Sequence, residues 1–159
     1  MTFVVTVQND ARFPVDTSRL QQAAQTVLVQ QAVEADSTLT IVITSDEAQQ
    51  ALNKQHRKID APTDVLSFPA DPLPSELSED GLYLGDLIIA FPYANSQAKR
   101  EGHALGDSLA LLVIHGTLHL LGYDHDTPEN RRAMWAAQAT ALKALGIDET
   151  IVPALENNH

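Results

Sequence analysis

The chain contains no cysteine among its 159 residues, so it can form neither a disulfide bond nor a metal site with thiolate ligands. Basic residues are also few, because 10 Lys and Arg stand against 21 Asp and Glu, which gives a formal net charge of -11. This charge argues against a general nucleic-acid coat protein, since such proteins are basic. It still allows an enzyme that binds a few phosphate groups locally.

Long apolar runs are missing as well. The longest run, Leu109 to Ile114, is much shorter than a membrane-spanning helix requires. The first residues lack the basic start and the apolar stretch of a signal peptide. We therefore expect a cytoplasmic protein with no membrane partner and no disulfide-linked partner. The length and the 44% hydrophobic content predict a single domain over residues 1–159.

Apolar periodicity and capping residues predict an alternation of strands and helices. The predicted strands cover residues 2–8, 38–44, 64–68 and 82–90, and the predicted helices cover 17–34, 47–57, 93–100, 104–121 and 128–145. Residues 69–81 are predicted to form a loop and the last dozen residues a frayed tail. This order predicts an α+β fold, in which a small mixed sheet of about four strands carries helices mainly on one face.

Three of the six histidines, His115, His119 and His125, lie within eleven residues of one another. The first two are four residues apart and share one face of the predicted central apolar helix. Gly122 can end that helix in a left-handed turn, after which His125 can meet the other two. Three converging imidazoles can hold one zinc ion and leave a coordination position open for water.

The acidic residues beside this cluster, Asp124 and Asp126, are candidates for hydrogen bonds that fix the tautomer of a ligand ring. They are equally well explained as ordinary acids of a turn. The spacing of the cluster also occurs in metzincin metalloproteases, where a glutamate after the first histidine is the general base. Here that residue is Gly116, which we interpret as leaving room beside the metal for a bulky substrate. A peptidase therefore stays an alternative, although this chain lacks the glutamate that is the general base of those enzymes.

The run from His115 to His125 resembles the signature of the YbeY family, H-G-x-L-H-L-x-G-Y-D-H, at every position. Two upstream blocks are similar to the same family. One contains Leu52-Asn53, Arg57 and the run from Pro62 to Pro69, and the other is the run from Gly85 to Ile89. The similar blocks span residues 52–125 in the family's order.

This resemblance implies a zinc-dependent endoribonuclease that acts on single-stranded RNA. It further implies roles in maturing the 3′ end of small-subunit ribosomal RNA and in ribosome quality control, with the small subunit and its assembly factors as partners. Zinc would be held by His115, His119 and His125, and Arg57 would be essential to activity. A non-enzymatic assembly factor with a structural zinc is a third possibility, which a fourth protein ligand would favour.

The chemistry of the residues is compatible with this implication. A zinc ion on three histidines can activate water without a carboxylate base, and the guanidinium group of Arg57 offers a rigid fork suited to phosphate. Lys54 and Lys58 are expected to help hold the RNA backbone. The remaining histidines, His56, His103 and His159, fit no pattern and are expected to be surface residues.

Overall fold

The computed structural model describes residues 3–70 and 83–151, so most of the predicted loop at 69–81 and residues 152–159 of the predicted C-terminal tail lie outside the described residues. The start of the predicted tail is not frayed, because residues 149–151 form a 3₁₀ turn and Ile151 is buried in the core. The chain forms its elements in the following order: β1 (Val4–Gln8), α1 (Thr17–Gln30), β2 (Thr38–Thr44), α2 (Asp46–Arg57), β3 (Val65–Pro69), β4 (Tyr83–Ala90), α3 (Phe91–Glu101), α4 (Leu105–Leu120) and α5 (Pro128–Ala144). In the described part of the chain, no helix is both long and apolar enough to cross a membrane.

The four strands form one mixed sheet in the order β1-β2-β4-β3. β1, β2 and β4 run parallel, whereas β3 pairs antiparallel with β4 and forms an edge of the sheet. Strand β2 alternates strictly, and its buried residues Leu39, Ile41 and Ile43 all point to one face. The predicted mixed sheet of about four strands is confirmed.

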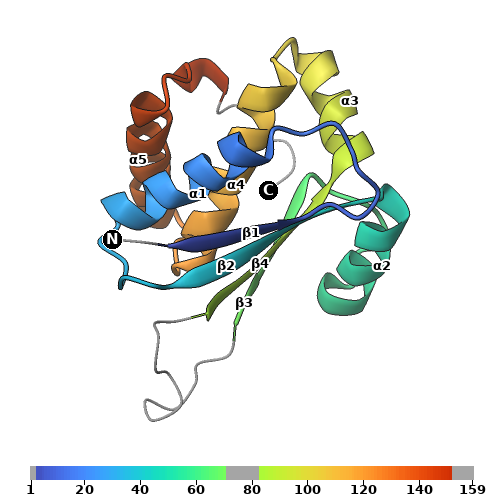
Figure 1. Ribbon diagram of the computed structural model, residues 1–159, viewed down its shortest axis with the longest axis horizontal. Coiled ribbons are helices and arrows are strands. Elements are labelled where there is room, and N and C mark those ends of the chain that lie inside the picture. The colour runs from blue at the N-terminus through green and yellow to red at the C-terminus, as the bar shows by residue number, and fades with distance from the viewer. Residues whose placement is uncertain (1–2, 71–82, 152–159) are drawn as a thin grey trace.

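Helices cover mainly one face of this sheet, as predicted. Figure 1 shows α1 and α4 crossing that face, with α5 outside α4, while α2 lies on the opposite side. Helix α2 is fixed there by the buried Gln49, whose side-chain nitrogen donates to the carbonyl oxygen of Ile88 at 3.0 Å. The sheet therefore has one face that several helices cover and one that α2 covers only in part.

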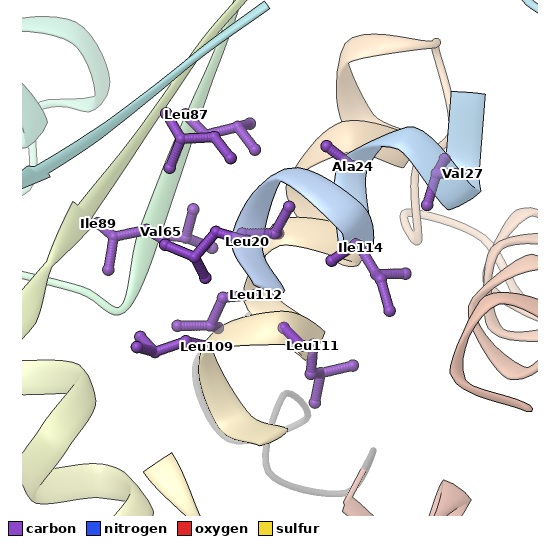
Figure 2. Close-up of a cluster of buried hydrophobic side chains, with 14 of the residues drawn as sticks. Leu20, Ala24, Val27, Val65, Leu87, Ile89, Leu109, Leu111, Leu112 and Ile114 are labelled. Carbon is purple, nitrogen blue, oxygen red and sulfur yellow. The ribbon is translucent and has the colours of Figure 1, made fainter. Parts of the chain in front are cut away.

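Helix α4 lies at the centre of the hydrophobic core. It is apolar on almost every side because it packs against the sheet, α1, α3 and α5 at once. Figure 2 shows Leu111 and Ile114 of this helix near Leu20 of α1, with Leu87 and Ile89 of β4 closing the same core. All five side chains are buried. Burying side chains of this size contributes about 1.5–3 kcal/mol each, so the position of α4 is strongly determined.

Candidate metal centre

Helix α4 carries the first two histidines into the interior. His115 is completely buried, and its Nε2 lies 3.1 Å from the Nε2 of His119, one helical turn later. Gly122 then adopts a φ of 99°, and the backbone N–H of Tyr123 donates to the carbonyl oxygen of Leu118 at 3.0 Å. This left-handed turn reverses the chain, as the position of the glycine predicts.

The reversal brings His125 to the other two histidines. Its ring centroid lies 5.5 Å from that of His115 and 5.2 Å from that of His119. One nitrogen of each ring falls within 4.8 Å of those of the other two, so the three rings could hold one metal ion. In the described ranges this group consists of three histidines, without a fourth histidine, cysteine or carboxylate ligand.

Hydrogen bonds fix the orientation of two of these rings. The Nδ1 of His119 lies 3.0 Å from the carbonyl oxygen of Tyr123, and the Nδ1 of His115 lies 2.6 Å from the Oε1 of Gln138. Both oxygens can only accept, so each Nδ1 donates its proton and each Nε2 keeps a lone pair. The two lone pairs then face the same small space, where a cation would stabilise them. The donor set therefore fits zinc.

Gln138, which holds the ring of His115, was not identified from the sequence. It is fully buried in α5, 23 residues after His115, and shares a helix face with the buried Met134, Ala141 and Leu142. A buried polar group requires a hydrogen-bond partner. A glutamine within an otherwise apolar helix face was thus a usable signal, although it could not have identified the partner.

Trp135 forms a second contact that the sequence reasoning did not foresee. Its ring centroid lies 5.9 Å from His115 and 5.7 Å from His125, with the rings edge to face. The guanidinium carbon of Arg131 lies over the same indole, 4.9 Å from its centroid. Because this is the only tryptophan of the chain, we expect its fluorescence to respond to changes at the histidine cluster.

A groove of about 500 Å³ opens in front of the histidines. Its lining also contains Arg57, the last residue of α2, and Asp124 from the turn after α4. The described structure therefore brings Arg57 to the same groove as the three histidines, which lie more than fifty residues later in the chain. His56 and Phe68 line this groove too, although His56 matched no sequence pattern.

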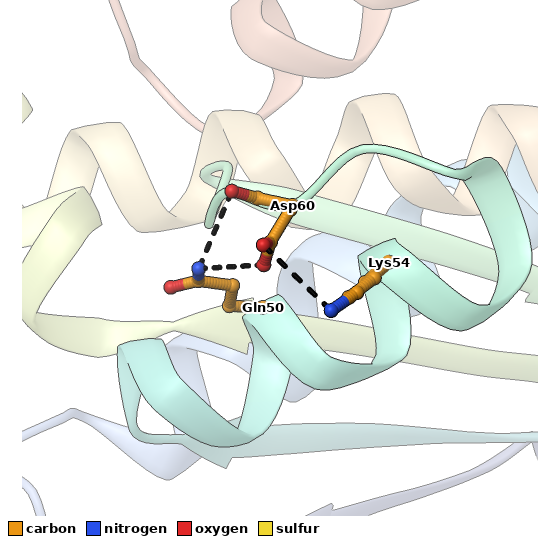
Figure 3. A network of polar contacts seen from close by, with 3 residues as sticks. All are labelled: Gln50, Lys54 and Asp60. Carbon is orange, nitrogen blue, oxygen red and sulfur yellow. Dashed lines mark hydrogen bonds and ion pairs between the residues drawn. The ribbon is translucent and has the colours of Figure 1, made fainter.

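The two predicted RNA-binding lysines do not line this groove. The Nζ of Lys54 lies 3.8 Å from the Oδ2 of Asp60, and the Oδ1 of Asp60 accepts from the Nε2 of Gln50 (Figure 3). Both charged side chains of the ion pair are largely exposed. The Nζ of Lys58 donates to the carbonyl oxygen of Gln55 at 3.4 Å. Arg57 is the only Lys or Arg among the described residues that line the groove. The role of the two lysines stays a prediction.

The two acids beside the cluster shape the turn that holds His125. Asp124 accepts from the backbone N–H of His125 at 2.8 Å. Asp126 accepts from the side chain of Asn130 at 2.8 Å. This hydrogen bond is the largest cause of the lowered pKa of Asp126, and the charge of His125 is the smallest contribution. The acceptors found for His115 and His119 are a glutamine and a backbone carbonyl instead. A ring-fixing role of the two acids stays a prediction.

The expectation that Gly116 leaves room for a substrate is wrong. Gly116 is buried where α4 meets the sheet, and a Cβ at this position would lie 2.8 Å from the Cδ2 of Leu87 and 3.2 Å from the Oγ of Ser67. The space is therefore already filled by β3 and β4. The glycine allows α4 to approach the sheet closely, and the same packing leaves no room for a protease-like glutamate.

Comparison with known proteins gives one consistent family. A family model described as "Endoribonuclease YbeY" matches residues 5–146. The protein of that name from Chloroflexus aggregans is 40% identical over 151 residues, which are 92% of this chain and 99% of the relative. The one from Thermobifida fusca is 38% identical over 142 residues, 87% of this chain and 91% of the relative.

A solved structure is also similar. The solution structure of TM1509 from Thermotoga maritima superposes with a TM-score of 0.54 and 23% identity, covering 89% of this chain and 91% of that chain. At this level of identity the likeness shows the fold.

Proposed function

This chain belongs to the YbeY endoribonuclease family, and on that premise we propose that it cleaves single-stranded RNA in a zinc-dependent reaction. The observation that carries this proposal is the three-histidine cluster, whose ligand nitrogens lie within 4.8 Å of one another at the wall of an open groove. The same groove contains Arg57, a cation suited to phosphate.

The groups of the histidine cluster and Arg57 have distinct tasks in this proposal. His115, His119 and His125 would hold the ion, which supplies Lewis acidity and a water of lowered pKa when bound. Gln138 and the carbonyl oxygen of Tyr123 keep the Nδ1 protons of two ligands in place. Arg57 would bind the non-bridging oxygens of the scissile phosphate and stabilise the charge that develops there.

The alternatives are less well supported by the geometry. A metzincin-like peptidase requires a glutamate at position 116, where Leu87 and Ser67 leave no space. A structural zinc site is normally closed by four protein ligands, whereas the described residues provide three. Both observations favour an open, hydrolytic site over a peptidase site and over a structural zinc site.

The cellular role follows from the family and is part of the proposal. We propose a cytoplasmic enzyme of one domain, residues 1–159, that matures the 3′ end of small-subunit ribosomal RNA and takes part in ribosome quality control. Its partners would be the small subunit and its assembly factors. The family model, which matches residues 5–146, supports the single domain.

The test combines metal analysis with RNA cleavage by the full chain. We expect about one zinc per purified chain, cleavage of a labelled single-stranded RNA, and loss of cleavage after chelation, with double-stranded RNA and casein as control substrates. The variants His115→Ala and Arg57→Glu should both be inactive. If both variants and the chelated protein cleave RNA like the wild type, the proposed site is wrong.

A further inference from the structure

We infer that His56 and Phe68 form a binding subsite for one nucleobase of single-stranded RNA, next to the metal centre. The inference rests on the proposed function, because it specifies how that substrate is held. His56 comes from the last turn of α2 and Phe68 from β3. Their ring centroids are 4.9 Å apart with an angle of 62° between the planes, so the two rings form an aromatic corner. Both rings line the groove that contains the metal ligands.

The geometry of β3 places this corner beside the phosphate site. Neighbouring residues of a strand point to opposite faces of the sheet. Ser67 faces α4, where its hydroxyl donates to the carbonyl oxygen of Gly116 at 3.4 Å, so Phe68 points to the side of α2. β3 is an edge strand, and the groove beside it is lined both by the histidines and by the two rings of the corner.

Arg57 lies in the groove that contains both the histidines and the aromatic corner. It directly follows His56 in the chain and lines the same groove as the histidines. A phosphate bound between Arg57 and the metal ligands would therefore have a base of the same strand within reach of the aromatic corner. Stacking of splayed bases on aromatic side chains is the usual way in which proteins recognise single-stranded RNA.

Both rings of the corner present surface to water. The side chain of His56 is exposed and that of Phe68 is only half-buried. Apolar ring surface that faces water gains free energy when a ligand covers it. Since both rings line the groove, a flat base has access to this surface.

The charge distribution indicates why stacking is needed here. The net charge of -11 repels RNA, Arg57 is the only Lys or Arg in the described lining of the groove, and Lys54 lies near Asp60 instead. Phosphate contacts can thus supply only a small part of the affinity. Stacking on an aromatic side chain does not depend on net charge and occurs with every base. The subsite would therefore favour single strands without selecting a sequence.

The test uses a labelled single-stranded RNA and a set of derivatives in which one abasic ribonucleotide is moved along the strand. Affinity is measured by fluorescence anisotropy with the full chain in EDTA, and kcat and KM are measured with zinc. At one position the abasic site should weaken wild-type binding about tenfold, the order expected for one stacked base. Phe68→Leu and His56→Ala should show a similar loss on intact RNA and almost no further loss on that abasic RNA.

Two sets of variants separate stacking from general damage. Phe68→Tyr and His56→Tyr keep a ring and should bind intact RNA within about twofold of the wild type. Tyr93→Leu and His103→Ala remove partly exposed rings that do not line the groove, and they should leave affinity and kinetics unchanged. For the two ring-removing variants of the corner we expect KM to rise while kcat changes little.

The subsite is overturned if no abasic position weakens binding, or if the abasic penalty is the same in Phe68→Leu and His56→Ala as in the wild type. These outcomes differ from a failure of the proposed function. A base-dependent affinity that both variants lose, without any RNA cleavage, would support the subsite and contradict the nuclease. Normal RNA cleavage, together with an abasic penalty that is the same in the variants and the wild type, would support the nuclease and contradict the subsite.

Discussion

On the α4 side of the groove, the completely buried His115 is held by the completely buried Gln138, whereas on the α2 side His56 and Arg57 are exposed at the end of a helix. The first side is part of the core, so its geometry is set before any ligand binds. The second side is surface, and its long side chains can adapt to a substrate. We therefore expect metal binding to be coupled to stability and RNA binding to be independent of it.

The substitution Gly116→Glu would affect the α4 side most strongly. A longer side chain must displace Leu87 and Ser67 and would bury a carboxylate, so we expect a loss of unfolding free energy of about 4 kcal/mol or more. Chemical denaturation measures this loss. Ala136→Glu, at an exposed position of α5, is the matched control and should change stability by less than about 0.5 kcal/mol. A stable Gly116→Glu protein would show that the packing of α4 tolerates the protease residue.

The substitution His115→Ala removes one of the three proposed zinc ligands. Because each ligand contributes a share of the binding free energy, we expect zinc binding to weaken by about 3 kcal/mol. Competition with a chromophoric chelator measures the affinity. Arg57→Ala provides the comparison from the other side of the groove and should bind zinc like the wild type while losing RNA cleavage. Equal zinc affinities in both variants would contradict the difference between the two sides.

The substitution Gln138→Leu should weaken zinc binding about 10- to 100-fold, since His115 loses the acceptor that fixes its tautomer. The tautomer itself can be observed in the ¹⁵N shifts of the His115 ring by NMR. Gln138→Glu keeps an acceptor at this position and should restore the Nδ1-protonated form. If Gln138→Leu left both the ring shifts and the zinc affinity unchanged, the role of Gln138 in fixing the His115 tautomer would be contradicted.

The substitution Lys54→Ala should have the smallest effect. The ion pair with Asp60 is exposed, so its loss should change the unfolding free energy by less than about 0.5 kcal/mol in thermal or chemical denaturation. Lys54 lies on α2 like Arg57, and each substitution removes one positive charge. If Lys54→Ala reduced RNA cleavage as much as Arg57→Ala, general charge rather than the lining of the groove would govern binding.

The elements of the fold were largely predictable because periodicity and caps are local properties. Helix α3 begins at Phe91 rather than at Tyr93, since Pro92 fits the first turn of a helix. Helix α1 ends at Gln30 instead of continuing to Glu34, and Ala32 then takes a φ of 53°. The exact ends of these helices depend on tertiary packing, which a local sequence pattern does not predict.

The histidine cluster was predictable for the same reason, because its spacing and Gly122 act within eleven residues. Gln138, Trp135 and the pair of His56 and Phe68 could not be found in this way, since their partners come from other elements of the chain. Gly116 was misinterpreted because a motif shows which residue follows a ligand but not which surface that residue packs against.

The central claim, that the three histidines hold a zinc ion that RNA cleavage requires, is tested most directly by returning zinc to the chelated protein in steps. Trp135 fluorescence and cleavage of single-stranded RNA are recorded in the same samples. We predict that both signals change together and saturate at about one zinc per chain. Cleavage that is complete before zinc is added, or that stays absent after the fluorescence has saturated, would contradict the account.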